Sequence, residues 1–280
     1  MQTIALGPLS IPLDRLLLML GFAGALVAGN LLSSSRQSPS ANDRLWLLLI
    51  AGVIGARAGF VARHWSLYAS RPLEILYIWD GGFWWPGAAT VVIALVAVYL
   101  IREPGNRRAL ASALLAGGLI WLGGTGLMAW LTPRAAMLPP VEMQQLNGSA
   151  VVLTDIAPGP RVINLWATWC GPCRREMPVL EAAANRHHDI AFVFANQRES
   201  AATVQAYLEA QSLDLDNVVL DASGRLGQAL GSGMLPTTLF VDRAGRIIDW
   251  HLGELTTVTL AAGVEQLHRT ATPEREMPAN

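Results

Sequence analysis

The sequence has few charged residues, only two cysteines and no lysine. Charged residues make up 15% of the 280 residues and hydrophobic ones 52%, so part of the chain is too apolar for a soluble domain. All the cationic side chains are arginines, with no basic cluster in a polar region, so nucleic acid is not an expected partner. Two cysteines exclude a four-cysteine zinc site. Because His187 and His188 are adjacent rather than spaced by three to five residues, we expect no metal and no other cofactor.

Charge divides the chain into two regions. Residues 1–140 contain ten arginines and five acidic residues, a net charge of +5. Residues 141–280 contain ten arginines and sixteen acidic residues, a net charge of −6. Such an asymmetry indicates that the two regions lie in different surroundings.

The first region contains long apolar runs. Three runs are free of charge, at residues 16–35, 81–101 and 109–133, and each reaches the length of about 20 residues that a membrane-spanning helix needs. A fourth run, 45–62, is interrupted only by Arg57. Arg57 either faces the interior of a helical bundle or extends to the membrane interface, and the sequence leaves both open. We therefore predict a bundle of about four transmembrane helices, the first of them uncleaved because its apolar run is too long for a signal peptide.

Arginines in the loops predict the orientation of this bundle. The two loops expected in the cytoplasm carry more arginines than the opposite side, which follows the positive-inside rule. Both chain ends, and the C-terminal domain with them, are then expected in the periplasm of a bacterial inner membrane. The cytoplasmic arginines are Arg36, Arg44, Arg102, Arg107 and Arg108; those opposite are Arg63, Arg71 and Arg134. Aromatic residues around the outer loop predict an interfacial belt: Trp65, Tyr68, Tyr77, Trp79, Trp84 and Trp85.

The second region alternates between strand and helix patterns, which predicts an α/β domain. A linker is expected at Met137–Gln145, and the polar residues 271–280 are expected to form a disordered tail. The predicted strands are 151–156, 161–166, 190–195, 217–220, 237–241 and 246–250, with a turn at 243–245. The predicted helices are 171–186, 200–211 and 257–268, the first with Met177, Leu180 and Ala184 on its inner face.

The two cysteines lie between a predicted buried strand and a predicted helix, in the motif Trp169-Cys170-Gly171-Pro172-Cys173. The free N–H groups and positive dipole at a helix N-terminus stabilise a thiolate, so the pKa of Cys170 should lie below that of a free thiol. Cys170 can then attack a substrate disulfide, and Cys173, one turn later, can resolve the mixed disulfide. A purely structural disulfide is the alternative, but closing so short a loop adds little stability.

Two further segments carry a family resemblance. Residues 161–180, RVINLWATWCGPCRREMPVL, and residues 233–247, GMLPTTLFVDRAGRI, closely resemble the TlpA/ResA-like branch of the thioredoxins. The resemblance covers about residues 141–270. It implies a thioredoxin-like domain with a redox-active Cys170–Cys173 disulfide, and a cis-proline at Pro236 opposite the cysteines. It also implies a substrate groove lined by Trp169, Leu235, Pro236 and Thr237.

The same resemblance assigns a role to Glu176, three residues after Cys173. Glu176 matches the acid of the family pattern C-x-x-C-x-x-E-x-P, where the acid is placed to exchange a proton with the buried cysteine. Ordinary thioredoxins have an aspartate six residues before the first cysteine, and that position is Asn164 here. Glu176 is therefore the expected proton-transfer residue. The alternative is that it is a solvated acid on a helix surface.

The apolar region has a resemblance of its own. Residues 55–61, GARAGFV, and the segment from Pro72-Leu73-Glu74 to Gly81-Gly82 resemble the early part of prolipoprotein diacylglyceryl transferase. The family's histidine, in G-G-M-S-F-H-G-G, is replaced by Pro86, and its later G-N-F-x-N-x-E signature is missing. We therefore interpret residues 1–135 as a truncated, remnant membrane anchor that contacts the lipid bilayer.

Together these features predict a membrane-anchored periplasmic thiol:disulfide oxidoreductase, with domains at 1–135 and 141–270. The Cys-Gly-Pro-Cys motif is that of thioredoxin and favours reduction of protein disulfides over oxidation. Because the apolar region has no cysteine, a separate donor, resembling the DsbD or CcdA membrane reductases, has to supply electrons. The alternatives are a thiol oxidase, a diacylglyceryl transferase-related protein with an accessory thioredoxin domain, and a non-enzymatic adaptor.

Overall fold

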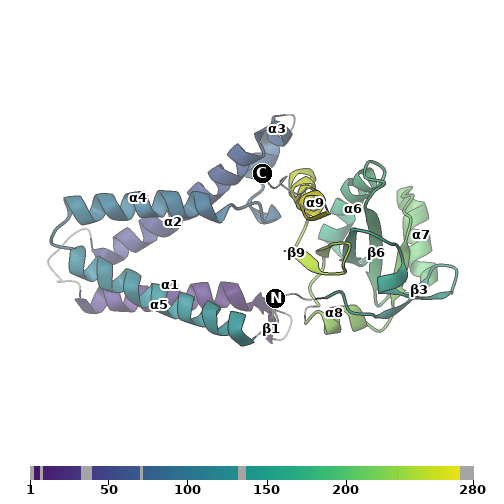
Figure 1. Ribbon diagram of the computed structural model, residues 1–280, viewed down its shortest axis with the longest axis horizontal. Coiled ribbons are helices and arrows are strands. Elements are labelled where there is room, and N and C mark those ends of the chain that lie inside the picture. Colours follow the sequence, from purple (N-terminus) through teal and green to yellow (C-terminus); the bar gives the residue numbers. More distant parts are fainter. Residues whose placement is uncertain are drawn as a thin grey trace, which may run out of the picture. The chain divides into compact units, whose positions relative to one another are not determined.

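The computed structural model describes residues 3–6, 9–32, 40–69, 72–131, 137–231 and 233–271. The chain forms two compact units, Met1–Ser70 with Gly82–Arg134, and Arg71–Gly81 with Ala135–Asn280 (Figure 1). The break after Arg134 lies next to the boundary that the sequence predicts. The grouping of Arg71–Gly81 with the second unit was not expected, because the sequence places that segment between two apolar runs.

The first unit is helical, as predicted. Its long helices are α1 (Leu13–Leu32), α2 (Ala41–Arg63), α4 (Trp85–Arg102) and α5 (Arg107–Leu131). Among the described residues, α2, α4 and α5 are long and apolar enough to cross a membrane, whereas the apolar part of α1, Arg15–Leu31, is shorter. A short hairpin, β1 (Thr3–Leu6) and β2 (Leu9–Pro12), precedes α1.

The apolar run at residues 81–101 becomes helical later than predicted. Helix α4 begins at Trp85 rather than at Gly81, with Pro86 in its first turn. A proline is tolerated there because the first N–H groups of a helix have no partner within the helix. Gly81 ends a 3-10 turn in the left-handed conformation, at φ 70°, which glycine adopts without strain. The residues between these two points form a non-helical connection.

Small residues allow the helices of this unit to approach closely. Helix α1 packs along α5, and α2 packs along α4. A Cβ atom on Gly87 would lie 2.5 Å from the carbonyl oxygen of Gly55, so the backbones of α2 and α4 touch where both residues are glycine. Helix pairs in membranes are typically packed through such small residues.

Arg57 faces the interior of the helical unit. It is 8% exposed, and its Nη1 donates a hydrogen bond of 2.9 Å to the carbonyl oxygen of Gly82. Its guanidinium lies 5.7 Å from the ring centre of Tyr68. The interior alternative is thus correct for Arg57. Tyr68, in the short helix α3 (Trp65–Tyr68), was assigned to the interfacial belt. It is fully buried instead, with its ring beside the guanidinium of Arg57.

The second unit is built on a seven-stranded mixed sheet, which confirms the predicted thioredoxin-like α/β class. The strand order is β4-β3-β7-β6-β5-β8-β9. The central strands β5, β6 and β7 are parallel, and β3 and β8 pair antiparallel with them on the two sides. The edge strands β4 and β9 pair antiparallel with β3 and β8. The strands are β3 (Glu142–Gln145), β4 (Ala150–Val152), β5 (Arg161–Trp166), β6 (Ala191–Gln197), β7 (Val218–Asp221), β8 (Thr237–Val241) and β9 (Ile247–Leu252).

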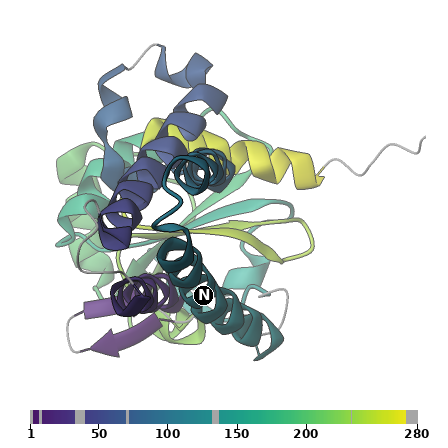
Figure 2. The same ribbon diagram turned by 90° about the vertical axis from the view of Figure 1, so that its left-hand side faces the viewer.

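Helices cover both faces of this sheet. One core contains side chains from α6 (Gly171–Ala184), α7 (Ala201–Gln211) and α9 (Thr257–Ala271). The core of the opposite face contains side chains from α8 (Arg225–Ala229) and from the segment before β5. In Figure 2, α9, drawn in yellow, lies along one side of the strands. Because β5 lies inside the sheet, paired with β6 on one side and β8 on the other, and is buried along its whole length, the residues that follow it start from a rigid position.

Several predicted elements differ from the structure. The predicted strand Val151–Ile156 is wrong beyond Val152, because a 3-10 turn at Leu153–Asp155 follows β4. The predicted linker Met137–Gln145 contains β3 and the buried residue Leu138, because this segment completes the second core. Helix α8 was not predicted. On α6, Met177 and Leu180 are buried as predicted and Ala184 packs, partly buried, against the same core, but Ala183, which was not predicted, is also buried there. The predicted disordered tail lies outside the described residues.

Candidate active site

The two cysteines lie at the N-terminus of α6, directly after the central strand β5. Cys170 is the N-cap residue, with an extended backbone, and its Sγ accepts a hydrogen bond of 3.3 Å from the backbone N–H of Cys173. Pro172 stands in the first turn of the helix. An N–H donor and the positive end of the helix dipole at the sulfur favour its thiolate form.

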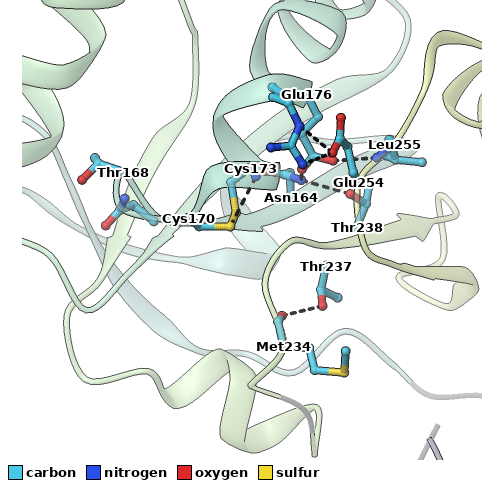
Figure 3. The surroundings of a disulfide bond; sticks show 12 residues. Asn164, Thr168, Cys170, Cys173, Glu176, Met234, Thr237, Thr238, Glu254 and Leu255 are labelled. Carbon is cyan, nitrogen blue, oxygen red and sulfur yellow. Dashed lines mark hydrogen bonds and ion pairs between the residues drawn. A yellow bond between two sulfur atoms is a disulfide. The ribbon is translucent and has the colours of Figure 1, made fainter. Parts of the chain in front are cut away.

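Cys170 and Cys173 form a disulfide with an S–S distance of 2.07 Å (Figure 3). Cys170 is 5% exposed and Cys173 is fully buried. Trp169, directly before the pair, is 70% exposed. A partner can thus approach the disulfide only from the Cys170 side, beside an exposed aromatic ring.

Glu176 lies in the same core as the disulfide, with no exposed surface. Its Oε1 accepts a hydrogen bond of 2.8 Å from Nδ2 of Asn164, and its Oε2 accepts one of 2.8 Å from the backbone N–H of Leu255 (Figure 3). Asn164 also donates to Oγ1 of Thr238, at 3.0 Å. The solvated alternative for Glu176 is therefore wrong. Asn164, at the position of the aspartate in ordinary thioredoxins, is instead a donor that holds Glu176.

Burial changes the acidity of Glu176. Loss of water contact raises its pKa to about 8, because the charged form is poorly solvated in the core. The hydrogen bonds from Leu255 and Asn164 lower the pKa in part, and the nearby charge of Glu254 raises it. Below this value the carboxyl group is protonated and can donate its proton.

Glu199 holds the loop before the cysteines, a contact that the sequence analysis missed. Its carboxylate accepts hydrogen bonds from both the backbone N–H and the hydroxyl of Thr168, at 2.7 and 2.5 Å. It also accepts one of 2.7 Å from Nδ2 of Asn196, which is buried at the end of β6. Glu199 thus fastens the Thr168–Trp169 turn to the neighbouring strand. Thirty-one residues separate Glu199 from Thr168, so no local pattern pointed to it.

We expect Glu199→Ala to lower the stability of the protein by at least about 2 kcal/mol, because the variant loses three hydrogen bonds to a charged, half-buried group, each of which contributes up to about 1.5–3 kcal/mol. The same change should alter the reduction potential of the cysteine pair, since Thr168 loses its fixed position. Thermal unfolding of the purified protein and equilibrium titration with glutathione would measure both effects. The exposed Glu209, on α7, provides the control variant Glu209→Ala. An equal loss of stability in both variants would contradict the stabilising role of the hydrogen bonds between Glu199 and Thr168.

Residues 233–247, the second segment with a family resemblance, contain a cis peptide bond between Leu235 and Pro236, as the resemblance implies. Leu235 packs against the cores on both faces of the sheet. Thr237 does not line a groove, because it is the first residue of β8, paired with both Leu165 and Leu252, and is 1% exposed. Its hydroxyl donates to the carbonyl oxygen of Met234, at 2.7 Å. The predicted role of the Thr237 side chain as a groove residue is therefore wrong.

A cavity of about 420 Å³ lies between the cysteine motif and the cis-proline segment, because Trp169 from the first and Leu235 from the second both line it. Its other side chains come from Leu165, Gln197, Arg198 and Gln228, and four glycines complete the wall. The mixture of apolar, amide and glycine surface next to Trp169 is suited to an extended peptide, which needs backbone partners and space for side chains. No local pattern in the sequence indicated the part of the wall formed by Gln197, Arg198 and the segment from Gly224 to Gly233.

Two protein families match the two units. Residues 134–266 match the family model Redoxin, and residues 2–125 match the family model Prolipoprotein diacylglyceryl transferase. Both matches agree with the two resemblances read from the sequence. They also show that the chain is a fusion of the two kinds of unit.

Individual relatives are similar to the second unit. Thiol-disulfide oxidoreductase ResA from Halalkalibacterium halodurans is 28% identical over 116 residues, which are 41% of this chain and 65% of the relative. Thioredoxin-like protein YneN from Bacillus subtilis is 30% identical over 122 residues, 42% of this chain and 71% of the relative. A solved thioredoxin family protein from Chlorobium tepidum covers 49% of this chain and 98% of its own, with 21% identity and a TM-score of 0.42. The fold assignment rests on the strand order, not on that structure.

Proposed function

The chain belongs, through residues 134–266, to the thioredoxin-like family of thiol-disulfide oxidoreductases, and we propose that it reduces disulfides of other proteins with the Cys170–Cys173 pair. The observation that carries the proposal is the cysteine pair itself, at a helix N-terminus, with Cys170 5% exposed and Cys173 fully buried. This arrangement separates an attacking thiol from a resolving thiol.

The proposed reaction proceeds in two exchanges. The Cys170 thiolate attacks one sulfur of the substrate disulfide, a mixed disulfide forms, and the second substrate sulfur leaves as a thiolate that takes a proton from water. Cys173 then loses its proton and attacks Sγ of Cys170, which releases the first substrate sulfur as a thiolate that is protonated in turn. The substrate gains two electrons and two protons, and the pair becomes the disulfide. We propose that Trp169, Leu235 and Pro236 position the substrate beside Cys170.

The oxidised pair has to be reduced again by another protein. The chain has no third cysteine, so no internal thiol can pass electrons to the pair. We propose a membrane thiol reductase of the DsbD or CcdA type as the donor. Its attack on Cys170 would leave Cys173 as a thiolate, and the protonated Glu176 is placed on the same helix to return a proton to it.

We propose that the helical unit anchors the enzyme in a bacterial inner membrane, with the second unit in the periplasm. Three helices of sufficient length and apolarity support a membrane anchor. The distribution of arginines in the loops supports the orientation. Since Pro86 replaces the histidine of the transferase family, we do not propose lipid transfer.

In cells, we expect both cysteines to be mostly reduced, and we expect Cys170, which unlike Cys173 is not fully buried, to react with a membrane-impermeant maleimide. Acid quenching followed by alkylation would report the redox state, and labelling of spheroplasts would report the side of the membrane. Because Cys170 and Cys173 are the only cysteines, the variant with both changed to serine provides the unlabelled control. A mostly oxidised pair in cells with an active donor would oppose the reductase assignment. Labelling only after membrane lysis would oppose the orientation.

A further inference from the structure

A turn after helix α6 carries two side chains able to bind a metal ion. His187 and Asp189 lie in the connection between α6 and β6. The backbone N–H of His187 donates to the carbonyl oxygen of Ala183, at 3.0 Å, and the N–H of Ile190 donates to that of His187, also at 3.0 Å. These two bonds fix the backbone that positions both side chains.

A third such side chain comes from the last turn of α9. Nδ1 of His268 lies 3.4 Å from Oδ2 of Asp189, and the ring centres of His187 and His268 are 5.9 Å apart. One ligand atom of each of the three residues lies within 4.8 Å of the others. Two imidazoles and a carboxylate therefore converge from segments about eighty residues apart in the chain.

We propose that His187, Asp189 and His268 form a binding site for a divalent transition-metal ion of the Zn²⁺ class. Imidazole nitrogen with one carboxylate is a donor set that suits zinc, nickel and copper(II), whereas magnesium and calcium prefer oxygen alone. Three protein ligands also leave a fourth tetrahedral position open for water.

The distances are compatible with metal coordination. Bonds of about 2.0–2.1 Å to a tetrahedral zinc ion place neighbouring ligand atoms about 3.4 Å apart. The separation between Asp189 and His268 already has this value. The other ligand atoms lie up to 4.8 Å apart, and rotation of the side chains has to bring them closer to bind an ion. Asp189 and His268 have room to rotate, because their side chains are 61% and 44% exposed.

The two segments that carry the ligands are firmly anchored. Ile190, next to Asp189, is 4% exposed and Leu267, next to His268, is fully buried, and both belong to the same core. The backbone therefore holds the three ligands near one another without a metal. A bound ion would clip the turn after α6 to the end of α9 and stabilise both.

The two arginines next to the ligands in sequence both have partners of their own. Nε of Arg186 donates to the carbonyl oxygen of Ala182, at 2.8 Å, and Arg269 forms an ion pair with Glu265. His188, directly between two of the ligands in sequence, is outside the cluster. It lines a cavity with Asp214 and Asp216, whose wall Asp189 also joins. As a neighbouring histidine outside the three-residue cluster, His188 provides a matched control.

The test is calorimetric titration of the full-length protein in detergent with zinc chloride, with a purification tag that contains no histidine. The protein is kept oxidised, so that the Cys170–Cys173 disulfide cannot bind zinc. We expect one ion per chain, and at least about tenfold weaker binding in His187→Ala and in His268→Ala. His188→Ala should bind as the wild type does. Zinc should also raise the thermal unfolding midpoint of the wild type and of His188→Ala, but not that of His268→Ala.

Two outcomes would overturn the site: no saturable zinc binding by the wild type, or an equal loss of binding in His188→Ala and His268→Ala. Thermal unfolding without zinc shows whether each variant is folded, and His268→Gln, which keeps the helix and side-chain volume, replaces His268→Ala if the latter is unstable. Disulfide reduction is measured in parallel. Because the site does not include the cysteines, failure of zinc binding with intact reductase activity would reject this inference and leave the proposed function standing.

Discussion

Cys170→Ser is expected to reduce the rate of disulfide reduction by at least about a thousandfold, the order of loss when a covalent nucleophile is removed. Serine keeps the size of the side chain and the N-cap geometry. Its hydroxyl is not ionised near neutral pH, whereas the helix N-terminus favours the thiolate of Cys170. The measurement is the turnover of a protein disulfide by the purified full-length enzyme with a fixed thiol donor.

Cys173→Ser should separate the two roles of the pair. Cys170 can still attack in this variant, but no second thiol is left to release the substrate. The enzyme should therefore accumulate as a mixed disulfide with its substrate, visible as a larger species on a non-reducing gel that disappears on reduction. The trapped partner can then be identified by mass spectrometry.

The neighbouring Arg174, exposed on α6, is the control for both variants, and Arg174→Ala should retain activity. Undiminished reduction by Cys170→Ser would remove the chain from the reductases. A mixed disulfide formed by Cys170→Ser but not by Cys173→Ser would reverse the roles of the two thiols.

Glu176→Gln is expected to slow the reduction of the enzyme's own disulfide by about a hundredfold at pH 7, a typical contribution of a general acid. Reduction by an external thiol leaves Cys173 as a buried thiolate, and Glu176 is the acid on its helix. Burial raises the pKa of Glu176 to about 8, so the acid form dominates below that pH. In the wild type, the rate per external thiolate should fall as pH rises through about 8. In Glu176→Gln it should be low and without this fall.

Stopped-flow tryptophan fluorescence during reduction by dithiothreitol, corrected for its thiolate fraction, would measure this pH profile. Glu209→Gln changes an exposed acid on α7 and is the matched control. If the fall near pH 8 persisted in Glu176→Gln, the titrating group would be another residue.

The same pKa shift has a consequence for stability. The pKa of Glu176 is raised in the folded protein, so its contribution to stability is fully present below the usual value of 4.5 and is lost as pH rises to about 8. The loss amounts to about 5 kcal/mol at most, at 1.36 kcal/mol per pH unit. Between pH 5 and pH 9 the thermal unfolding midpoint should therefore fall further in the wild type than in Glu176→Gln.

Local patterns in the sequence predicted most elements and the reactive pair. Strand β5 was predicted with its observed limits, because a short, mostly apolar run after a glycine-proline pair and before a helix pattern is typical of a buried strand. Predicted element boundaries were wrong where contacts with distant parts of the chain decide the secondary structure. The residues of the predicted linker enter the sheet as β3 because they pair with β7, whose position the linker residues do not encode.

The sequence by itself therefore determined that two cysteines begin a helix after a buried strand, and that apolar runs precede this domain. Both depend on spacing within a few tens of residues. Only the tertiary structure decided the surroundings of the pair. The buried Glu176 accepts a hydrogen bond from Leu255, 79 residues away, and Glu199, after β6, reaches Thr168, after the neighbouring strand β5. His187 meets His268 because α6 and α9 share one core. Such contacts depend on which elements pack together. Hydrophobic periodicity indicates which face of a helix or strand is buried, but it does not indicate which other element covers that face.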